Sequence, residues 1–173
     1  GVMTFCLTDI VESTQLWDEH PDAMPLALVR HDDLIAQTVD VHGGRFLKSM
    51  GEGDSTFSVF DSATHALDAA IAATEALADE EWPGGLDLRV RVALHTGEAH
   101  ERAGDFFGPA LNRAARLRSL ARSGTVVLSQ ATAEIVMGDV VLDTLTRQVK
   151  QNGDAVGLTA REYAIVELLA LQR

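Results

Sequence analysis

Two aspartates lie where the sequence changes from a strand-like pattern to another kind of element. Asp9 follows the β-rich run 2–8 and precedes a helical segment, and Asp54 lies in the turn-rich segment 51–54. If their strands are sheet neighbours, the two carboxylates meet at one edge. Paired carboxylates at such an edge suit a divalent cation and a phosphate substrate. Each aspartate alone also has a plainer interpretation, as a helix cap or as a turn residue.

Asn112 and Arg116 form a second pair of residues that could do chemistry. Their four-residue spacing puts both side chains on one face of a helix. An amide and a guanidinium there can hold a ribose and a charged phosphorus centre, although the plainer interpretation is a solvated helix face. Other catalytic patterns are absent from the sequence. It has no P-loop, no Gly-x-Ser-x-Gly motif, and six histidines without metal-ligand spacing.

The composition limits which classes of protein this chain can belong to. Its 173 residues allow one full domain and little more, and its net charge of −12 disfavours general nucleic-acid binding. No apolar run approaches the roughly 20 residues that span a bilayer, and the N-terminus lacks the features of a secretory signal. The single cysteine, Cys6, excludes an internal disulfide. We therefore expect a cytoplasmic domain that binds neither nucleic acid nor membrane.

The elements that must position these residues alternate along the chain. Strand patterns cover 2–8, 86–99 and 125–129, and residues 45–60 read as a hairpin around 51–54. Helical patterns cover 11–41 with a proline interruption, 62–79, 109–122 and 130–136, while 104–108 reads as a loop. The fold class predicted is α/β, an α+β sandwich in which helices pack against a mainly antiparallel sheet.

The tail of the chain differs from the rest. Residues 140–149 and 155–158 are strand-like around a hairpin turn at 151–154. A capping box at 159–162 then predicts the start of an apolar helix. We expect the chain to divide into 1–137 and 138–173.

Four segments, taken in order, resemble the catalytic domain of class III nucleotide cyclases. They are residues 4–14, 48–57, 88–98 and 104–117. The resemblance is greatest to bacterial cyclase-homology domains carried by large transcriptional regulators, and it implies a ferredoxin-like cyclase fold over 1–137. Residues 138–173 resemble the first strands and first helix of an OmpR-like winged-helix domain. Since the recognition helix is missing, that tail should not read DNA.

The resemblance implies a role for each candidate residue. Asp9 and Asp54, together with Ile10, match the site of two divalent cations, Mg²⁺ or Mn²⁺. Asn112 matches the residue that orients the ribose, and Arg116 the one that stabilises the transition state. The remaining residues implied at the substrate are Asp105 at the purine, and Lys48, Met50, Ile10 and Val11.

The family's reaction and assembly follow from the same resemblance. The ribose 3′-hydroxyl of ATP attacks the α-phosphate and releases pyrophosphate, giving 3′,5′-cyclic AMP. Members are homodimers in which each site is built from both chains. Asp105 is the adenine-type residue, so ATP is expected over GTP.

Two departures from the family keep a second function open. The turn 51–54 is two residues longer than usual, so the adenine-selecting position holds Met50 or Lys48, depending on the alignment. The family's late phosphate-binding lysine has no clear counterpart. Lys150 is the only lysine in that part of the chain, and it stands in an unfamiliar sequence context. The alternative to an active cyclase is a weakly active or inactive nucleotide-binding regulatory module. A purely structural dimerisation domain would bind no nucleotide.

Overall fold

The computed structural model describes residues 1–50, 54–137, 140–143, 148–151 and 154–157. The chain divides into two compact units, Gly1–Thr132 and Ala133–Arg173. All the candidate site residues named above except Lys150 belong to the first unit. Side chains are described there except at 48–50, where only the backbone is given.

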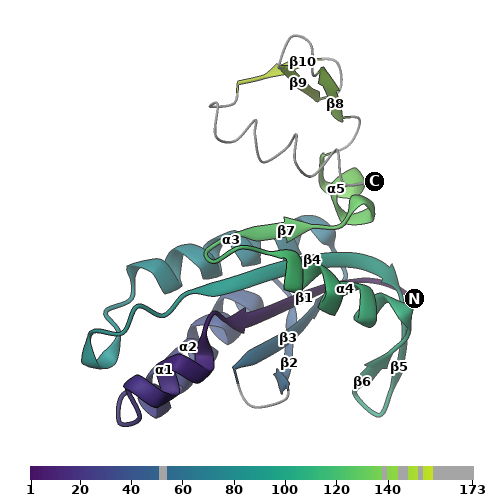
Figure 1. The fold of residues 1–173 in the computed structure, drawn as a ribbon. Helices are drawn as coiled ribbons and strands as arrows, with labels where there is room; N and C mark the ends of the chain where they lie inside the picture. The colour runs from purple at the N-terminus through teal and green to yellow at the C-terminus, as the bar shows by residue number, and fades with distance from the viewer. Residues whose placement is uncertain (51–53, 138–139, 144–147, 152–153, 158–173) are drawn as a thin grey trace. The chain divides into compact units, whose positions relative to one another are not determined.

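The first unit is built on a five-stranded sheet, which confirms the predicted mainly antiparallel arrangement (Figure 1). Its order is β2 (Arg45–Met50), β3 (Ser55–Phe60), β1 (Val2–Ile10), β4 (Val90–Glu98) and β7 (Val126–Leu128). Only the β4–β7 pair is parallel. The predicted hairpin is β2–β3, and β1 pairs antiparallel with both β3 and β4. The central strand therefore carries Asp9 between two partners.

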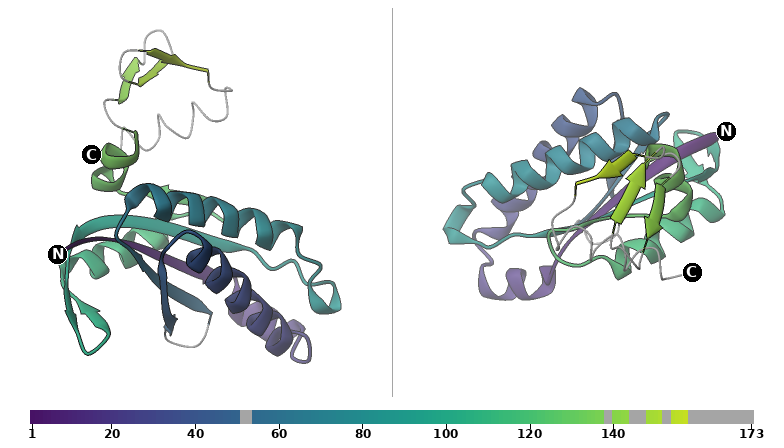
Figure 2. Two further views of the ribbon diagram at one scale, coloured as in Figure 1. Left: turned by 180° about the vertical axis from the view of Figure 1, so that it is seen from behind. Right: turned by 90° about the horizontal axis from the view of Figure 1, so that it is seen from above.

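Helices pack on the two faces of this sheet, as predicted (Figure 2). One face is covered by α2 (Met24–Val41) and α3 (Ala63–Asp79), and the other by α4 (Pro109–Leu120). The expected proline interruption separates α2 from α1 (Ser13–Glu19). The short α5 (Gln130–Met137) follows β7, and a 3-10 turn, η1 (Pro83–Gly85), follows α3. None of the helices in the described ranges is long and apolar enough to cross a bilayer.

The alternation of side chains along β1 gives each face its own core. Cys6 and Ile10 pack with α2 and α3, whereas Phe5 and Leu7 pack with α4. Residues directly opposite on neighbouring strands share a face of the sheet. Asp9 therefore lies on the α4 face, one step beyond Leu7 in the same row of alternating positions.

Most of the segment 104–108, which the sequence predicts to be a loop, is instead the second strand of a β-hairpin. The hairpin pairs β5 (His100–Arg102) with β6 (Asp105–Phe107). Ala103 and Gly104 join the strands with positive φ angles of 54° and 83°. A two-residue turn with two positive φ angles matches the right-handed twist of paired strands, so even these short strands close into a hairpin.

The hairpin is attached to the core through one aromatic ring. Phe106 is buried and contacts Phe5 and Phe57, with ring centroids 5.8 and 6.4 Å away. The guanidinium of Arg45 covers the same ring at 5.2 Å and forms an ion pair with Glu101 at 3.0 Å. These contacts fix the strand that begins with Asp105, the exposed residue just before Phe106.

The described part of the second unit contains a three-stranded antiparallel sheet of β8 (Val140–Asp143), β9 (Gln148–Gln151) and β10 (Asp154–Val156). The single strand expected over 140–149 is thus two strands, paired with Val141 opposite Lys150. The predicted capping box at 159–162 lies outside the described residues.

Candidate functional site

Strand pairing brings Asp9 and Asp54 to the same end of neighbouring strands. Asp9 ends β1 opposite Ser55, the first residue of β3. The backbone N–H of Ile10 donates to the carbonyl oxygen of Asp54 at 2.9 Å. The two aspartates, far apart in sequence, are therefore adjacent in the sheet.

Arginines engage both carboxylate oxygens of Asp9. Arg91, opposite Asp9 on β4, donates from Nε to Oδ1 at 2.9 Å and from Nη2 to Oδ2 at 2.7 Å. Arg118 of α4 brings its Nε to 3.6 Å from Oδ2 and donates from Nη1 to the carbonyl oxygen of Thr8 at 3.2 Å. Hydrogen bonding to Asp9 raises the pKa of the Arg91 guanidinium above its ordinary value. Asp9 is buried, with 9% of the residue exposed, so these charge-assisted bonds are only weakly screened by solvent.

Asp54 has a different set of partners. The hydroxyl of Ser13, the first residue of α1, donates to its Oδ2 at 2.5 Å. The hydroxyl of Ser55 lies 3.5 Å from Oδ1. The Asp54 charge also acts on Arg91, whose pKa it helps to raise. Asp9, Asp54, Arg91 and Arg118 therefore form one cluster of two negative and two positive charges.

The donor chemistry of this cluster fits a hard divalent cation. Two carboxylates offer oxygen ligands, and Ile10 can add only its backbone carbonyl oxygen. Mg²⁺ is commonly held by one or two protein carboxylates, with water and phosphate oxygens completing its shell. Over the described residues there is no group of three or more His, Cys, Asp or Glu side chains that could hold a metal ion. The cluster therefore fits cations that arrive with a phosphate substrate, rather than a closed all-protein site.

Ile10 and Val11, the two residues after Asp9 that the resemblance places at the substrate, have backbone N–H groups that already donate hydrogen bonds. The N–H of Ile10 is bonded to Asp54, and the N–H of Val11 donates to the carbonyl oxygen of Arg89 at 2.8 Å. The reason is that the chain continues to pair with its neighbours for two residues past Asp9, before α1 begins at Ser13. The backbone N–H groups of Ile10 and Val11 are therefore not available to a phosphate, and their predicted place at the substrate remains a prediction.

Asn112 and Arg116 lie on α4 but do not join the cluster. Both are exposed, whereas Ala110 and Ala114 of the same helix are buried against the sheet. Among the described residues, no hydrogen bond or ion pair links Asn112 or Arg116 to Asp9 or Asp54. One chain therefore brings the two carboxylates together and leaves the ribose and transition-state candidates facing outward.

The remaining predicted substrate residues lie on β2 and β6. The backbone of Met50 is opposite Ser55, which is itself opposite Asp9, and Lys48 is opposite Phe57. A register shift in the backbone pairing lies between Phe46 and Lys48, before both positions. Their side chains, and the turn 51–53, lie outside the described residues. Asp105 is exposed on β6, opposite Arg102.

Sequence reasoning missed Arg91, Arg118 and Ser13. Arg91 alternates with apolar residues along its strand. This pattern indicates only that its side chain points away from the apolar face of the strand, and it does not show what the side chain contacts. Arg118 follows Arg116 by two residues and so lies on a different side of the helix. One signal could have found Arg91. It is an arginine in one of the four cyclase-like segments, and a positive charge there could pair with the predicted carboxylates.

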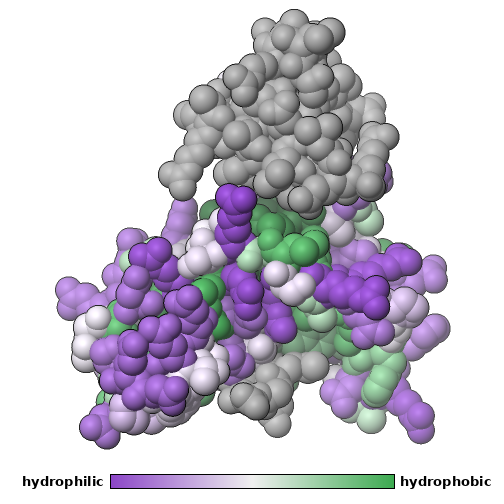
Figure 3. All heavy atoms as spheres, in the orientation of Figure 1, coloured by the Kyte–Doolittle hydropathy of each residue, from purple (hydrophilic) through white to green (hydrophobic). Residues whose placement is uncertain are grey.

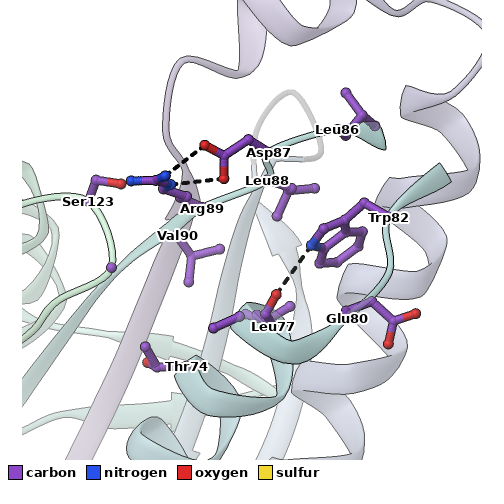
Figure 4. A pocket seen from close by; sticks show the side chains of 12 residues that line it. Thr74, Leu77, Glu80, Trp82, Leu86, Asp87, Leu88, Arg89, Val90 and Ser123 are labelled. Atoms are coloured by element: carbon purple, nitrogen blue, oxygen red, sulfur yellow. Dashed lines mark hydrogen bonds and ion pairs between the residues drawn. The ribbon is translucent and has the colours of Figure 1, made fainter. Parts of the chain in front are cut away.

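A cavity of about 470 Å³ lies apart from this cluster, and none of the candidate residues lines it. It is formed by the end of α3, the segment before β4 and the turn before β7 (Figure 4). Its polar groups already have partners: Arg89 pairs with Asp87 at 2.8 Å, and the Trp82 indole N–H donates to the Leu77 carbonyl oxygen at 3.2 Å. The cavity is therefore a less suitable place for phosphate chemistry than the carboxylate cluster.

The surface around α4 differs from the surface around α1. In Figure 3 hydrophobic residues gather near α4, while the region of α1 is mostly hydrophilic. Leu120 of α4 and Phe107 of β6 are 70% and 54% exposed. The exposed side of α4 thus combines Asn112 and Arg116 with nearby apolar side chains.

Comparisons with known proteins agree with the cyclase resemblance. Residues 2–161 match the family model described as "Adenylate and Guanylate cyclase catalytic domain". Uncharacterized protein Rv0891c of Mycobacterium tuberculosis is 39% identical over 143 residues, which are 83% of this chain and 48% of that protein. An adenylate cyclase of Podospora anserina is 30% identical over 154 residues, covering 75% of this chain and 7% of its own length. The chain thus spans about half the length of its mycobacterial relative.

Solved structures agree with the fold. A structure of adenylate cyclases from Trypanosoma brucei in their monomeric state has a TM-score of 0.71 and 25% identity, covering 90% of this chain and 85% of that one. The resemblance of the tail to a winged-helix domain is not borne out. The cyclase family model continues to residue 161, and so takes in the three strands β8–β10.

Proposed function

The chain belongs to the family of adenylate and guanylate cyclase catalytic domains, and we propose that this nucleotide cyclase converts ATP to 3′,5′-cyclic AMP and pyrophosphate. The observation that carries the proposal is the carboxylate pair. Asp9 and Asp54 are joined through the Ile10 N–H···O=C bond at the end of two neighbouring strands. The choice of ATP over GTP rests on Asp105, the adenine-type residue, and on relatives named adenylate cyclases.

The proposed site binds the triphosphate through its metal-binding edge. Asp9 and Asp54 would hold two Mg²⁺ or Mn²⁺ ions, and these ions would offset phosphate charge and lower the pKa of the 3′-hydroxyl. Arg91 supplies a fixed positive charge at this edge, since its Nη2 lies 2.7 Å from Asp9. The 3′-hydroxyl loses its proton to solvent, and the O3′–phosphorus bond forms at the α-phosphate as the bond to the pyrophosphate oxygen breaks. Charge that develops on the phosphoryl oxygens requires a further cation.

We assign that further cation to Arg116 of a second copy of the chain, with Asn112 of the same helix orienting the ribose. The assignment is supported by the outward position of both side chains and by the lack of any bond to Asp9 or Asp54 within one chain. Exposed Phe107 and Leu120 offer apolar surface for such an assembly. A homodimer with two-fold symmetry would then contain two equivalent sites.

The proposal is tested by incubating the purified chain with ATP and Mn²⁺, then with Mg²⁺, and measuring cyclic nucleotide by mass spectrometry. GTP is run in parallel, and an Asp9→Ala, Asp54→Ala double variant is the control. Cyclic AMP that disappears in the double variant supports the proposal. Cyclic GMP as the main product would contradict the choice of base.

A second function is favoured by one observation. Both oxygens of Asp9 are engaged by arginines, which lowers the affinity of this edge for cations. A nucleotide-binding regulatory module with little turnover would have that property. Binding of ATP measured by calorimetry, without cyclic product, would favour the module over the enzyme.

A further inference from the structure

The charge cluster around Asp9 leads to an inference that rests on the proposed function. Asp9 and Asp54 carry two negative charges, and Arg91 and Arg118 carry two positive charges close to them. A pair of carboxylates attracts divalent cations, whereas a cluster that is neutral overall attracts them much less. Any cation that takes Asp9 as a ligand therefore competes with guanidinium groups.

The two arginines differ in how they are held. Arg91 is fixed by strand register, directly opposite Asp9, and makes a bidentate pair with it. Arg118 reaches Asp9 from the last turn of α4, and its Nε lies 3.6 Å from the same Oδ2 that Arg91 contacts at 2.7 Å. Two like charges that share one oxygen repel each other, and Arg118 has the longer contact. Arg118 is thus the cation that is more easily displaced.

We propose that Arg118 is a positioning residue that competes with the divalent cation for Oδ2 of Asp9. It holds the end of β1 through the Thr8 carbonyl oxygen and sets how tightly this edge binds cations. A cation that binds Oδ2 displaces the Arg118 guanidinium and the Nη2 contact of Arg91, whereas the Nε of Arg91 keeps its hydrogen bond to Oδ1. The affinity of the site for Mn²⁺ is therefore set partly by α4, the helix that also carries Asn112 and Arg116.

The test is Mn²⁺ binding to the 173-residue chain, measured by calorimetry and by the electron paramagnetic resonance signal of free Mn²⁺, without nucleotide. Arg118→Gln should tighten binding about three- to tenfold, because one positive charge leaves the cluster. Arg118→Lys keeps the charge and should stay close to the wild-type affinity. Arg113→Gln is the matched control. It removes the same charge from the same helix, but Arg113 acts on His95 and not on Asp9.

Further variants separate failure of this inference from failure of the proposed function. Asp54→Asn should abolish Mn²⁺ binding at this edge. If it leaves binding unchanged, the metal site is elsewhere, and the proposed function and the inference fail together. If Asp54→Asn abolishes binding but Arg118→Gln behaves like Arg113→Gln, only the inference is wrong. A purely structural Arg118 would give weaker binding and a lower melting temperature in Arg118→Gln, which would also overturn it.

Discussion

The end of the central strands and the exposed side of α4 carry the two halves of the proposed chemistry in different ways. At the strand ends, register alone brings Asp9, Asp54 and Arg91 together within one chain. On α4, Asn112 and Arg116 share a face but meet no other candidate residue. The difference is what the proposed function requires, in which one chain supplies the metal-binding half of a site and a second copy supplies the transition-state half.

The largest expected effect comes from the strand-end half. Asp54→Asn should lower metal-dependent cyclic AMP formation by at least about a hundredfold, because a neutral amide cannot replace a carboxylate ligand. Ser13 can still donate to the side-chain oxygen, so the fold should persist. Product is measured by mass spectrometry, and folding by circular dichroism. If the folded variant keeps wild-type turnover, Asp54 is not part of the site, and the strand ends do not form its metal-binding half.

Substitutions on the exposed side of α4 should lower kcat more than they weaken substrate affinity. Asn112→Ala should lower kcat about ten- to a hundredfold and change KM less than threefold, because its proposed role is to position the ribose in the transition state. Steady-state kinetics with Mn²⁺ and ATP give both values. The exposed neighbour Ala115, changed to Ser, is the control on the same helix. Equal losses in affinity and rate would make Asn112 a simple binding contact.

The smallest expected effect is on the pH dependence of stability, and it comes from a histidine on the face of the sheet that α4 covers. His95 is buried opposite Phe5, and both burial and the Arg113 charge lower its pKa below the ordinary value. In the unfolded chain His95 titrates near pH 6.5, while the folded chain keeps it neutral to lower pH. As pH falls below about 6.5, the unfolded state binds the extra proton and stability decreases.

We therefore expect the melting temperature to be lower at pH 5 than at pH 7, with His95 contributing on the order of a few °C. His95→Gln should reduce this pH dependence, whatever it does to the melting temperature at pH 7. Melting curves recorded at both pH values for the two proteins measure the contribution. An identical pH dependence in the variant would show that His95 is not a source of it.

The strand-end half was largely predictable from the sequence, because it depends on local patterns. A β-rich run that leads to Asp9 and a hairpin that turns at Asp54 define the strands, and these strands need only pair to bring the carboxylates together. The hydrogen bonds of the Ile10 and Val11 amides could not be predicted, because their acceptors, Asp54 and Arg89, are distant in the sequence. The hairpin of β5 and β6 was missed because its strands have only three residues each.

The contact between Arg118 and Asp9 could not be predicted from sequence. It depends on how α4 crosses the sheet, and that is decided by packing of Ala110 and Ala114 against Phe5 and its neighbours. Helical spacing shows that Arg118 and Arg116 lie on different sides of α4. It does not show which of them faces the sheet.

The most direct test of a site divided between two chains is to mix two inactive variants. Asp54→Asn lacks the metal-binding half, and Arg116→Ala lacks the transition-state half. In a random mixture half of the dimers are mixed, and each mixed dimer regains one intact site of two, so activity should return to about a quarter of wild type. Activity that stays at the level of the separate variants, although the mixed dimers form, would contradict a site shared between chains.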